Sequence, residues 1–339
     1  MNNAKYIIGV YNVEDMILIP GTKWIVGGGI TAYGPGAEDQ VITKNYLHLF
    51  DSETETGDKV DSYKIAIRPD SDIYPETNAP DWETFSPHGI SFGKQENNKI
   101  TLYACNHGGR ESVEAFEIDY SGDTPTFTWI GAIVAQEDFW PDAVAYIPDG
   151  GLVVTSTQSP LQDPEEAIQM QLKGGPVGST RLWYSGKGWS NLEGAEKIST
   201  PNGVLVSPDG NRIYVAASTN FGIYRIDRSN EKPVVDFAKV DGIPDNIRWS
   251  ADGKSMLAGV HTADPMVFAT SMGEAIKTGG NIPTPFNITR IDAETMETSI
   301  VVPSAIYATM GGGTGAIEVG NRLWVSTTKA DRIAIFDLD

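Results

Sequence analysis

The stretch that decides the fold reads GVLV at 203–206, PDGN at 208–211 and RIYV at 212–215. Both flanking runs are short and rich in the β-branched, aromatic and other apolar residues that favour strands. The Asp-Gly pair between them supplies the positive φ angles that a tight turn between two twisted strands requires. The stretch therefore predicts a β-hairpin.

The same pattern recurs along the chain, and no long helical stripe interrupts it. The further copies lie at 16–27, 89–103, 143–155, 246–258 and 316–325. Six copies in a chain of 339 residues leave about 56 residues for each, which is enough for a four-stranded sheet and its loops. We therefore expect an all-β fold, a single six-bladed β-propeller domain over residues 1–339.

The six copies are unevenly spaced, so some blades must carry insertions. We expect these near 33–81, 158–180 and 262–286, where they form either lids over a pocket or plain surface loops. The last strand, at 332–337, alternates like an edge strand, and residues 6–10 are suited to pair with it. N- and C-terminal strands in one blade would close the ring and leave no free sheet edge.

The composition excludes several classes of partner. The chain has 25 Lys and Arg against 45 Asp and Glu, a formal net charge of −20. Nucleic acids and anionic membrane surfaces bind clustered cationic side chains, so we expect neither as a partner. The excess of acid is either a solvated surface or, in part, a set of ligands for a hard cation such as calcium.

Few sequence features bear on the compartment. Cys105 is the single cysteine, so no intramolecular disulfide and no thiolate metal cluster can form. No run of 18 apolar residues occurs, and the first ten residues lack the apolar run of a secretory signal. We expect a soluble protein that is periplasmic or secreted if a leader was removed, and cytoplasmic otherwise.

A polar residue recurs at one spacing before the turns. In four hairpins the residue seven positions before a turn residue is polar. The turn residues are at 21, 149, 209 and 252, and the polar residues are Glu14, Asp142, Asn202 and Asp245. The first strand of each blade lines the central channel, so equivalent residues of separate blades converge there. Their oxygens, with those of the neighbouring Asp15 and Asn246, suit a hard cation with six to eight ligands. The alternative is that each side chain merely satisfies backbone groups of its own turn.

Histidines are the second signal. His88 stands at the start of an inner strand, His107 follows the next strand, and His261 ends the strand after the Asp245 hairpin. A neutral imidazole beside a cation is suited to taking a proton from water. A packed or solvated histidine at a strand end is the alternative.

Together these residues resemble the paraoxonase/arylesterase group of six-bladed propellers, whose wider relatives are the senescence-marker-protein/gluconolactonase propellers. The resemblance covers nearly the whole chain and rests on the order of its motifs. These are VED at 13–15, PHGIS at 87–91, NH at 106–107, DAVA at 142–145, NGV at 202–204 with DG at 209–210, DNI at 245–247, and VH at 260–261.

The resemblance implies two calcium ions in the channel. The ligands that it implies for a catalytic ion are Glu14, Asn202, Asp245 and Asn246. Those that it implies for a deeper structural ion are Asp15, the backbone carbonyl of Ile90, and Asp142. It further implies that His107 orients His88, which activates water, and that His261 lies close by in the pocket wall. Pro141 departs from the family, which usually has a ligating amide at that position.

The expected function is therefore hydrolysis of a lactone or an aryl ester, with the carbonyl polarised by calcium and water activated by His88 and His107. Position and apolarity add Trp140, Met266, Phe268 and Tyr307 as pocket-wall residues. Two alternatives remain. One is a gluconolactonase-type sugar-lactone hydrolase with an acidic base such as Asp245. The other is a non-catalytic propeller that uses calcium only for rigidity and binds a ligand.

Overall fold

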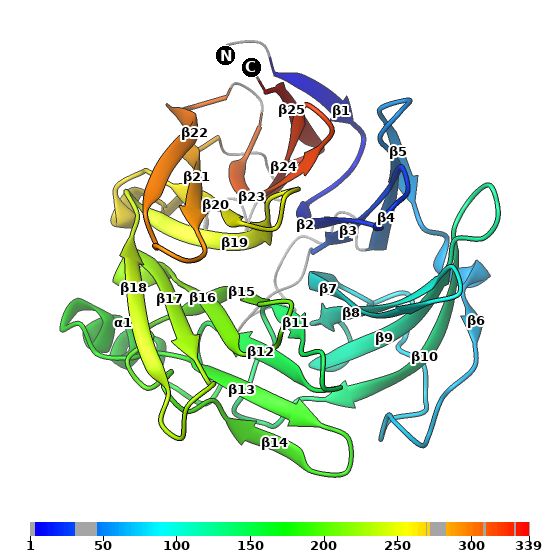
Figure 1. Cartoon of the computed structure of the whole chain (residues 1–339), viewed down its shortest axis with the longest axis horizontal. Helices are drawn as coiled ribbons and strands as arrows, with labels where there is room; N and C mark the ends of the chain where they lie inside the picture. Colours follow the sequence, from blue (N-terminus) through cyan, green and yellow to red (C-terminus); the bar gives the residue numbers. More distant parts are fainter. Residues whose placement is uncertain are drawn as a thin grey trace. The chain divides into compact units, whose positions relative to one another are not determined.

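The computed structural model describes residues 4–30, 46–268, 270–271, 283–307, 310–328 and 330–338. The chain divides into two compact units, the first comprising Met1–Val60, Ala216–Ile223 and Phe237–Asp339 and the second Asp61–Val215 and Tyr224–Asp236. Across the described residues, six sheets follow one another along the chain, as labelled in Figure 1. This is the six-bladed β-propeller fold that the hairpin pattern predicts.

Three of the sheets belong to the first unit. In order of strand pairing, one contains β2 (Val13–Leu18), β3 (Trp24–Gly29), β4 (Tyr46–Asp51) and β5 (Thr56–Lys59). Another contains β19 (Ile243–Trp249), β20 (Ser255–His261), β21 (Phe286–Asp292) and β22 (Thr298–Ala305). The third contains β23 (Gly312–Val319), β24 (Arg322–Thr328), β25 (Arg332–Asp337) and β1 (Lys5–Ile8).

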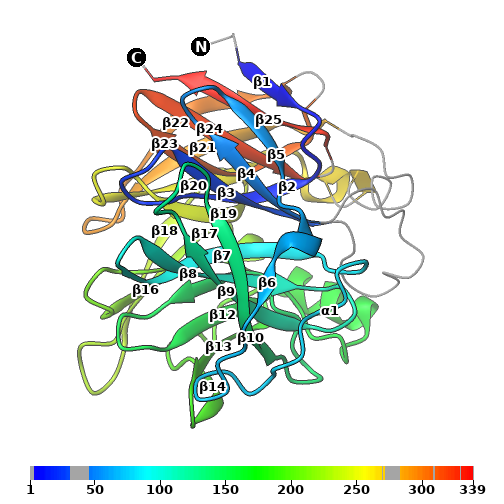
Figure 2. The same ribbon diagram turned by 90° about the vertical axis from the view of Figure 1, so that its right-hand side faces the viewer.

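Two sheets belong to the second unit. One contains β7 (Pro87–Glu96), β8 (Lys99–Asn106), β9 (Ser112–Asp119), β10 (Thr126–Val134) and the short β6 (Ala66–Ile67). The other contains β11 (Val144–Tyr146), β12 (Leu152–Ser156), β13 (Ser179–Tyr184) and β14 (Gly188–Asn191). The edge strand β6 runs parallel to β10, and Figure 2 shows the two strands side by side.

The remaining sheet includes residues of both units. Its strand order is β15 (Pro201–Val206), β16 (Arg212–Ala217), β17 (Gly222–Asp227) and β18 (Val234–Lys239). In all six sheets the first strand of the predicted hairpin lies at one edge. The second strand of the hairpin is hydrogen-bonded to it. All six predicted hairpins are therefore confirmed.

The turn chemistry explains why the hairpins form where the sequence predicts. Gly210 and Gly253 both have positive φ, at 76° and 68°. In each turn the preceding aspartate accepts a hydrogen bond from the backbone N–H two residues on, Asn211 for Asp209 and Lys254 for Asp252, at 3.1 and 3.0 Å. The Asp-Gly pair thus both reverses the chain and satisfies a backbone donor.

The terminal strands share one sheet, as predicted. β1 pairs antiparallel with β25, from Lys5 opposite Ile335 to Ile8 opposite Arg332. Figure 1 shows the two strands side by side near both ends of the chain. Alternate residues of this sheet pack into a core with the β2 sheet that includes Val13, Met16 and Trp324.

The expected insertions differ in character. The segment 33–81 contains β4 and β5, which are ordinary outer strands, and its residues 31–45 lie outside the described part of the chain. The segment 158–180 contains a helix, α1 (Pro164–Leu172), because Asp163 accepts hydrogen bonds from the backbone N–H groups of Glu165 and Glu166 and a proline occupies the first turn. In the segment 262–286, residues 269 and 272–282 lie outside the described residues.

Two short 3₁₀ turns, η2 and η3, lie at Ser62–Lys64 and Ser218–Asn220, and residues 265–268 and 270–271 are helical. No helix among the described residues is long and apolar enough to cross a membrane. That residues 1–339 form one domain stays a prediction.

Candidate active site

Side chains and backbone groups join the inner strands within each unit. In the first unit Asn246 Nδ2 of β19 and Thr314 Oγ1 of β23 both donate to the backbone carbonyl of Glu14 in β2, at 3.2 and 2.5 Å. In the second unit the N–H of Gly89 in β7 donates to the carbonyl of Asp142, just before β11, at 3.1 Å. The strand starts that carry the predicted polar residues therefore lie against one another within their own units.

The second unit contains a pair of histidines in contact. His88 is the second residue of β7 and His107 directly follows β8, so the antiparallel pairing of these strands places them at the same end. His88 Nδ1 lies 3.0 Å from His107 Nε2, and both residues are buried. The structure therefore brings together the two side chains to which the family resemblance assigns water activation.

Glu111 extends this pair to a row of three groups. Its Oε2 atom lies 2.7 Å from His107 Nδ1. Burial lowers the pKa of His107, while the Glu111 carboxylate opposes this shift and the neighbouring His88 adds to it. His107 is therefore a neutral imidazole near neutral pH.

The remaining predicted residues of the second unit are Asp142, Asn202, Ile90 and Trp140, and each has its own surroundings. Asp142 Oδ1 is 4.0 Å from His88 Nδ1. Asn202, in β15, accepts a 2.6 Å hydrogen bond at its backbone carbonyl from Thr155, whereas its side-chain Oδ1 is buried and meets no hydrogen-bond partner within the described residues. Ile90 is fully buried in β7, and Trp140 is half-buried before β11.

The first unit contains a cluster of carboxylate and amide side chains around Glu14. Asn246 Nδ2 donates to Glu14 Oε1 at 2.6 Å, and both side chains are buried. Burial, and then the nearby carboxylates of Asp245 and Asp15, hold the pKa of Glu14 well above its usual value. Hydrogen bonding by Asn246 and the charge of Arg248 oppose that shift. Three of the four predicted catalytic-calcium ligands, Glu14, Asp245 and Asn246, therefore belong to this cluster.

Asp15 has a different partner. Arg248, two residues after Asn246 on the same face of β19, donates from Nε to Asp15 Oδ1 at 2.9 Å and from Nη2 to Oδ2. The side chains of both residues are almost completely buried, at 8% and 1% exposure. A bidentate guanidinium thus compensates the charge of Asp15 within the protein.

His261 is bonded to Asp245 rather than to another histidine. Its Nε2 lies 2.8 Å from Asp245 Oδ2, and its ring centroid is 4.3 Å from that of Phe268. Its Nδ1 is buried and, among the described residues, has no hydrogen-bond partner. The predicted contact of His261 with the pocket stays a prediction, as do the roles of Trp140 and Phe268.

The donor chemistry of the Glu14 cluster fits a hard cation. Two carboxylates and an amide offer oxygen ligands, and a cation among them would relieve the crowding of negative charge. Over the part of the chain that the structure describes, no group of three or more His, Cys, Asp or Glu side chains is arranged to hold a metal ion. The ligand sets that join Asn202 to Glu14, or Asp15 to Ile90 and Asp142, stay predictions.

Two candidate functional residues, Glu111 and Arg248, were not predicted from the sequence. Glu111 stands four residues after His107, and the Gly108-Gly109 pair between them is a turn signal that indicates a loop folding back. Arg248 had a clearer signal, because an arginine follows Asn246 by two residues in a strand that otherwise reads as buried. A charge in that place requires a buried partner.

The fold and the two polar clusters define a six-bladed propeller with titratable side chains at the starts of its inner strands. The chain belongs to the SMP-30/gluconolactonase/LRE-like family, whose model matches residues 42–296. It has no match among the curated proteins searched.

Two solved structures share the fold over almost the whole chain. One is a luciferin-regenerating enzyme, with a TM-score of 0.56 and 15% identity over 99% of this chain and 96% of that one. The other is a gluconolactonase from Xanthomonas campestris, with a TM-score of 0.53 and 14% identity over 99% of this chain and 90% of that one.

Proposed function

We propose that the protein is a hydrolase of lactones or aryl esters in which His88 deprotonates the attacking water. Membership in a family whose description includes gluconolactonase supports a lactone substrate. The observation that carries the proposal is the 3.0 Å contact between His88 Nδ1 and His107 Nε2. A pair of buried imidazoles with a carboxylate behind it is a pattern typical of a general base and its orienting groups.

In this proposal the water O–H bond breaks as its oxygen bonds to the carbonyl carbon, and the proton passes to His88. His107 orients the ring of His88 through their hydrogen bond. Opening of the lactone ring, or departure of the phenol of an aryl ester, then requires a proton on the leaving oxygen, which protonated His88 can return. The same residue thus acts first as base and then as acid.

We further propose that Glu14, Asp245 and Asn246 bind calcium. When bound, such an ion would polarise the carbonyl group and stabilise the negative charge that forms on its oxygen. The raised pKa of Glu14 and the 2.6 Å contact between Glu14 and Asn246 support a site built for a cation. Because Arg248 already compensates Asp15, we propose one bound ion in this unit.

Metal analysis combined with turnover assays tests this proposal. The protein as purified, the chelated protein and the calcium-reloaded protein are compared on a panel of lactones and phenyl acetate. We expect calcium to be bound and hydrolysis to disappear on chelation and return on reloading. Unchanged turnover after complete removal of calcium would overturn the metal-assisted mechanism. A calcium-loaded protein that hydrolyses no member of the panel would favour a non-catalytic binding protein.

A second candidate is a gluconolactonase-type sugar-lactone hydrolase, in which an acidic residue is the base. The 2.8 Å contact between Asp245 Oδ2 and His261 Nε2 favours it, because a histidine beside the carboxylate can orient it. This candidate expects aldonolactones to compete better than hydrophobic lactones and His88→Gln to retain activity. The leading proposal expects the reverse on both counts, so the same assays decide between them.

A further inference from the structure

Glu111 is placed to control the histidine pair from behind. It ends the loop that begins at His107 and directly precedes β9. Its Oε2 atom lies 2.7 Å from His107 Nδ1, and its side chain is 29% exposed where that of His107 is 1% exposed. A carboxylate accepts hydrogen bonds and does not donate them. The contact therefore requires the proton of the neutral His107 ring to be on Nδ1.

The tautomer of His107 in turn determines the tautomer of His88. A neutral imidazole with its proton on Nδ1 has a lone pair on Nε2, and Nε2 is the atom of His107 that faces His88 Nδ1 at 3.0 Å. His88 must then donate from Nδ1, so its own lone pair is on Nε2. Asp142 Oδ1, at 4.0 Å from the same Nδ1, is beyond hydrogen-bond distance and does not take this proton.

We propose that Glu111 is a positioning residue that sets the tautomers of His107 and His88 through these two hydrogen bonds. Without its carboxylate, His107 Nδ1 loses its acceptor, and a reversed arrangement competes in which His107 Nε2 donates to His88 Nδ1. In that arrangement the proton of His88 is on Nε2, the atom that the proposed reaction needs as a base. The catalytic consequence rests on the proposed function, whereas the tautomers do not.

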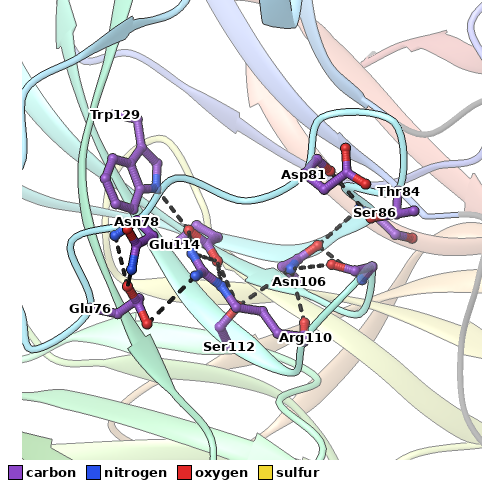
Figure 3. A network of polar contacts seen from close by, with 11 residues as sticks. Glu76, Asn78, Asp81, Thr84, Ser86, Asn106, Arg110, Ser112, Glu114 and Trp129 are labelled. Carbon is purple, nitrogen blue, oxygen red and sulfur yellow. Dashed lines mark hydrogen bonds and ion pairs between the residues drawn. The ribbon is translucent and has the colours of Figure 1, made fainter.

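The loop that carries Glu111 is fixed from both sides by buried polar contacts, shown in Figure 3. The flanking residues both bond to Glu114: Arg110 donates from Nε and Nη2, each at 2.9 Å, and Ser112 Oγ donates at 2.6 Å. Trp129 Nε1 donates to the same carboxylate at 2.7 Å. Glu114 is completely buried, so these contacts anchor the residues on either side of Glu111.

Asn106 closes the other end of the loop. Its Oδ1 accepts hydrogen bonds from the backbone N–H groups of Ser86 and Gly108, at 2.9 and 3.0 Å, and its Nδ2 donates to the carbonyls of Gly108 and Arg110, both at 3.0 Å. A side chain at position 108 would collide with the carbonyl oxygen of Thr84. The backbone between His107 and Glu111 therefore has little freedom, and the carboxylate is held in place for the ring nitrogen.

The tautomers are measured directly by the ¹⁵N chemical shifts of the imidazoles. The chain has four histidines, so their signals can be assigned by substitution. In the wild type we expect Nδ1–H for both His88 and His107. In Glu111→Ala we expect both rings to move toward Nε2–H, and in Glu111→Gln a smaller change, because an amide can still present an acceptor. Glu117→Gln, which changes the same residue type later in β9, is the matched control and should leave the tautomers unchanged.

Two results would overturn the proposal: Nε2–H for His107 in the wild type, or unchanged tautomers in a folded Glu111→Ala variant. Kinetics give the second readout. We expect kcat to fall about 10–100-fold in Glu111→Ala, with KM little changed, as is typical when a residue that orients a functional imidazole is lost. If no lactone or ester is hydrolysed, the proposed function fails, while the NMR spectra still decide whether Glu111 sets the tautomers.

Discussion

Both units of the protein contain a buried histidine that is hydrogen-bonded to a carboxylate, and the two differ in what lies at the other ring nitrogen. In the second unit Glu111 bonds His107 at 2.7 Å, and the far nitrogen of His107 contacts His88. In the first unit Asp245 bonds His261 at 2.8 Å, and the far nitrogen of His261 is buried without a hydrogen-bond partner among the described residues.

In the proposed mechanism, the histidine–carboxylate pair of the second unit acts on water only through a second imidazole. The ring of His261 packs against Phe268, and a Cβ added at Gly312 would lie 2.7 Å from its Nδ1. Among the described residues, no second imidazole is hydrogen-bonded to this ring. The pair in the second unit continues to His88, the residue that we propose accepts the proton of water. Three predictions test how far this contrast extends.

The largest effect is expected on turnover. His88→Gln removes the proposed base and should lower kcat/KM about 10²–10⁴-fold, the usual contribution of a general base. His261→Gln removes a ring that has no such role in the leading proposal, and it should lower kcat/KM much less. Initial rates on the most active lactone of the panel measure both. If His261→Gln proved the more damaging variant and His88→Gln were tolerated, the contrast would be reversed in favour of the gluconolactonase-type mechanism.

The next largest effect is expected on the free energy of unfolding. It tests how each unit compensates the charge of a buried carboxylate. Arg248→Met leaves Asp15 buried without its guanidinium and should lower the free energy of unfolding by about 3–5 kcal/mol. Arg110→Met should lower it by about 1–3 kcal/mol, because Glu114 keeps its bonds from Ser112 and Trp129. Urea unfolding measures both variants.

The double variant Asp15→Asn/Arg248→Met is the control for the first of these, since it removes both charges together. It should be more stable than Arg248→Met alone. Equal losses in the two arginine variants would show that the hydrogen bonds of Ser112 and Trp129 do not replace a counter-charge.

The smallest effect comes from a histidine that has no carboxylate partner. Burial lowers the pKa of His48 to about 4, although its hydrogen bond to the carbonyl of Tyr11 opposes the shift. Since the unfolded chain binds this proton near pH 6.5, the stability that neutral His48 contributes is present above pH 6.5 and is lost as the pH falls toward 4. Between pH 7 and pH 5 the loss should be about 2 kcal/mol.

His48→Gln should remove that part of the pH dependence, because a glutamine amide can donate to the same carbonyl without titrating. The measurement is the difference in unfolding free energy between wild type and variant at the two pH values. An identical pH slope in the two proteins would show that His48 is not the group responsible. In that case burial without a carboxylate partner would not lower the pKa of His48 enough to affect the stability of the protein in this pH range.

Much of the fold was predictable from local sequence. The turn residues, an Asp-Gly pair in three of the copies, and the apolar runs around them predicted all six hairpins. Turn geometry and strand pairing depend on neighbouring residues, so a local pattern can indicate them. The helix α1 was missed even though Asp163 and Pro164 form a recognisable helix start. The strands β4 and β5 lie within the stretch 33–81, where an insertion was expected, and they complete the four-stranded sheet that begins with β2.

The candidate site was predictable in part. The recurrence of polar residues at the starts of inner strands pointed to Glu14, Asp245 and Asn246, and the scarcity of histidines pointed to His88 and His107. Glu111 was not predictable, because its contact with His107 depends on the path of a short loop fixed by Asn106 and Glu114. Arg248 could have been noticed as a charge in a buried strand, but not assigned to Asp15, which lies 233 residues away in the sequence.

The sequence by itself determined the repeated hairpins, the residue types at the inner strand starts and the family to which they are similar, because each of these depends on residue identity and spacing. Only the tertiary structure decided which charged group meets which. Asp15 is paired with an arginine from a distant strand, and the order of Glu111, His107 and His88 fixes where the protons of the two rings lie. Hydrogen bonds and ion pairs require donor and acceptor atoms to be placed to within a few tenths of an ångström, and no local sequence pattern specifies this placement.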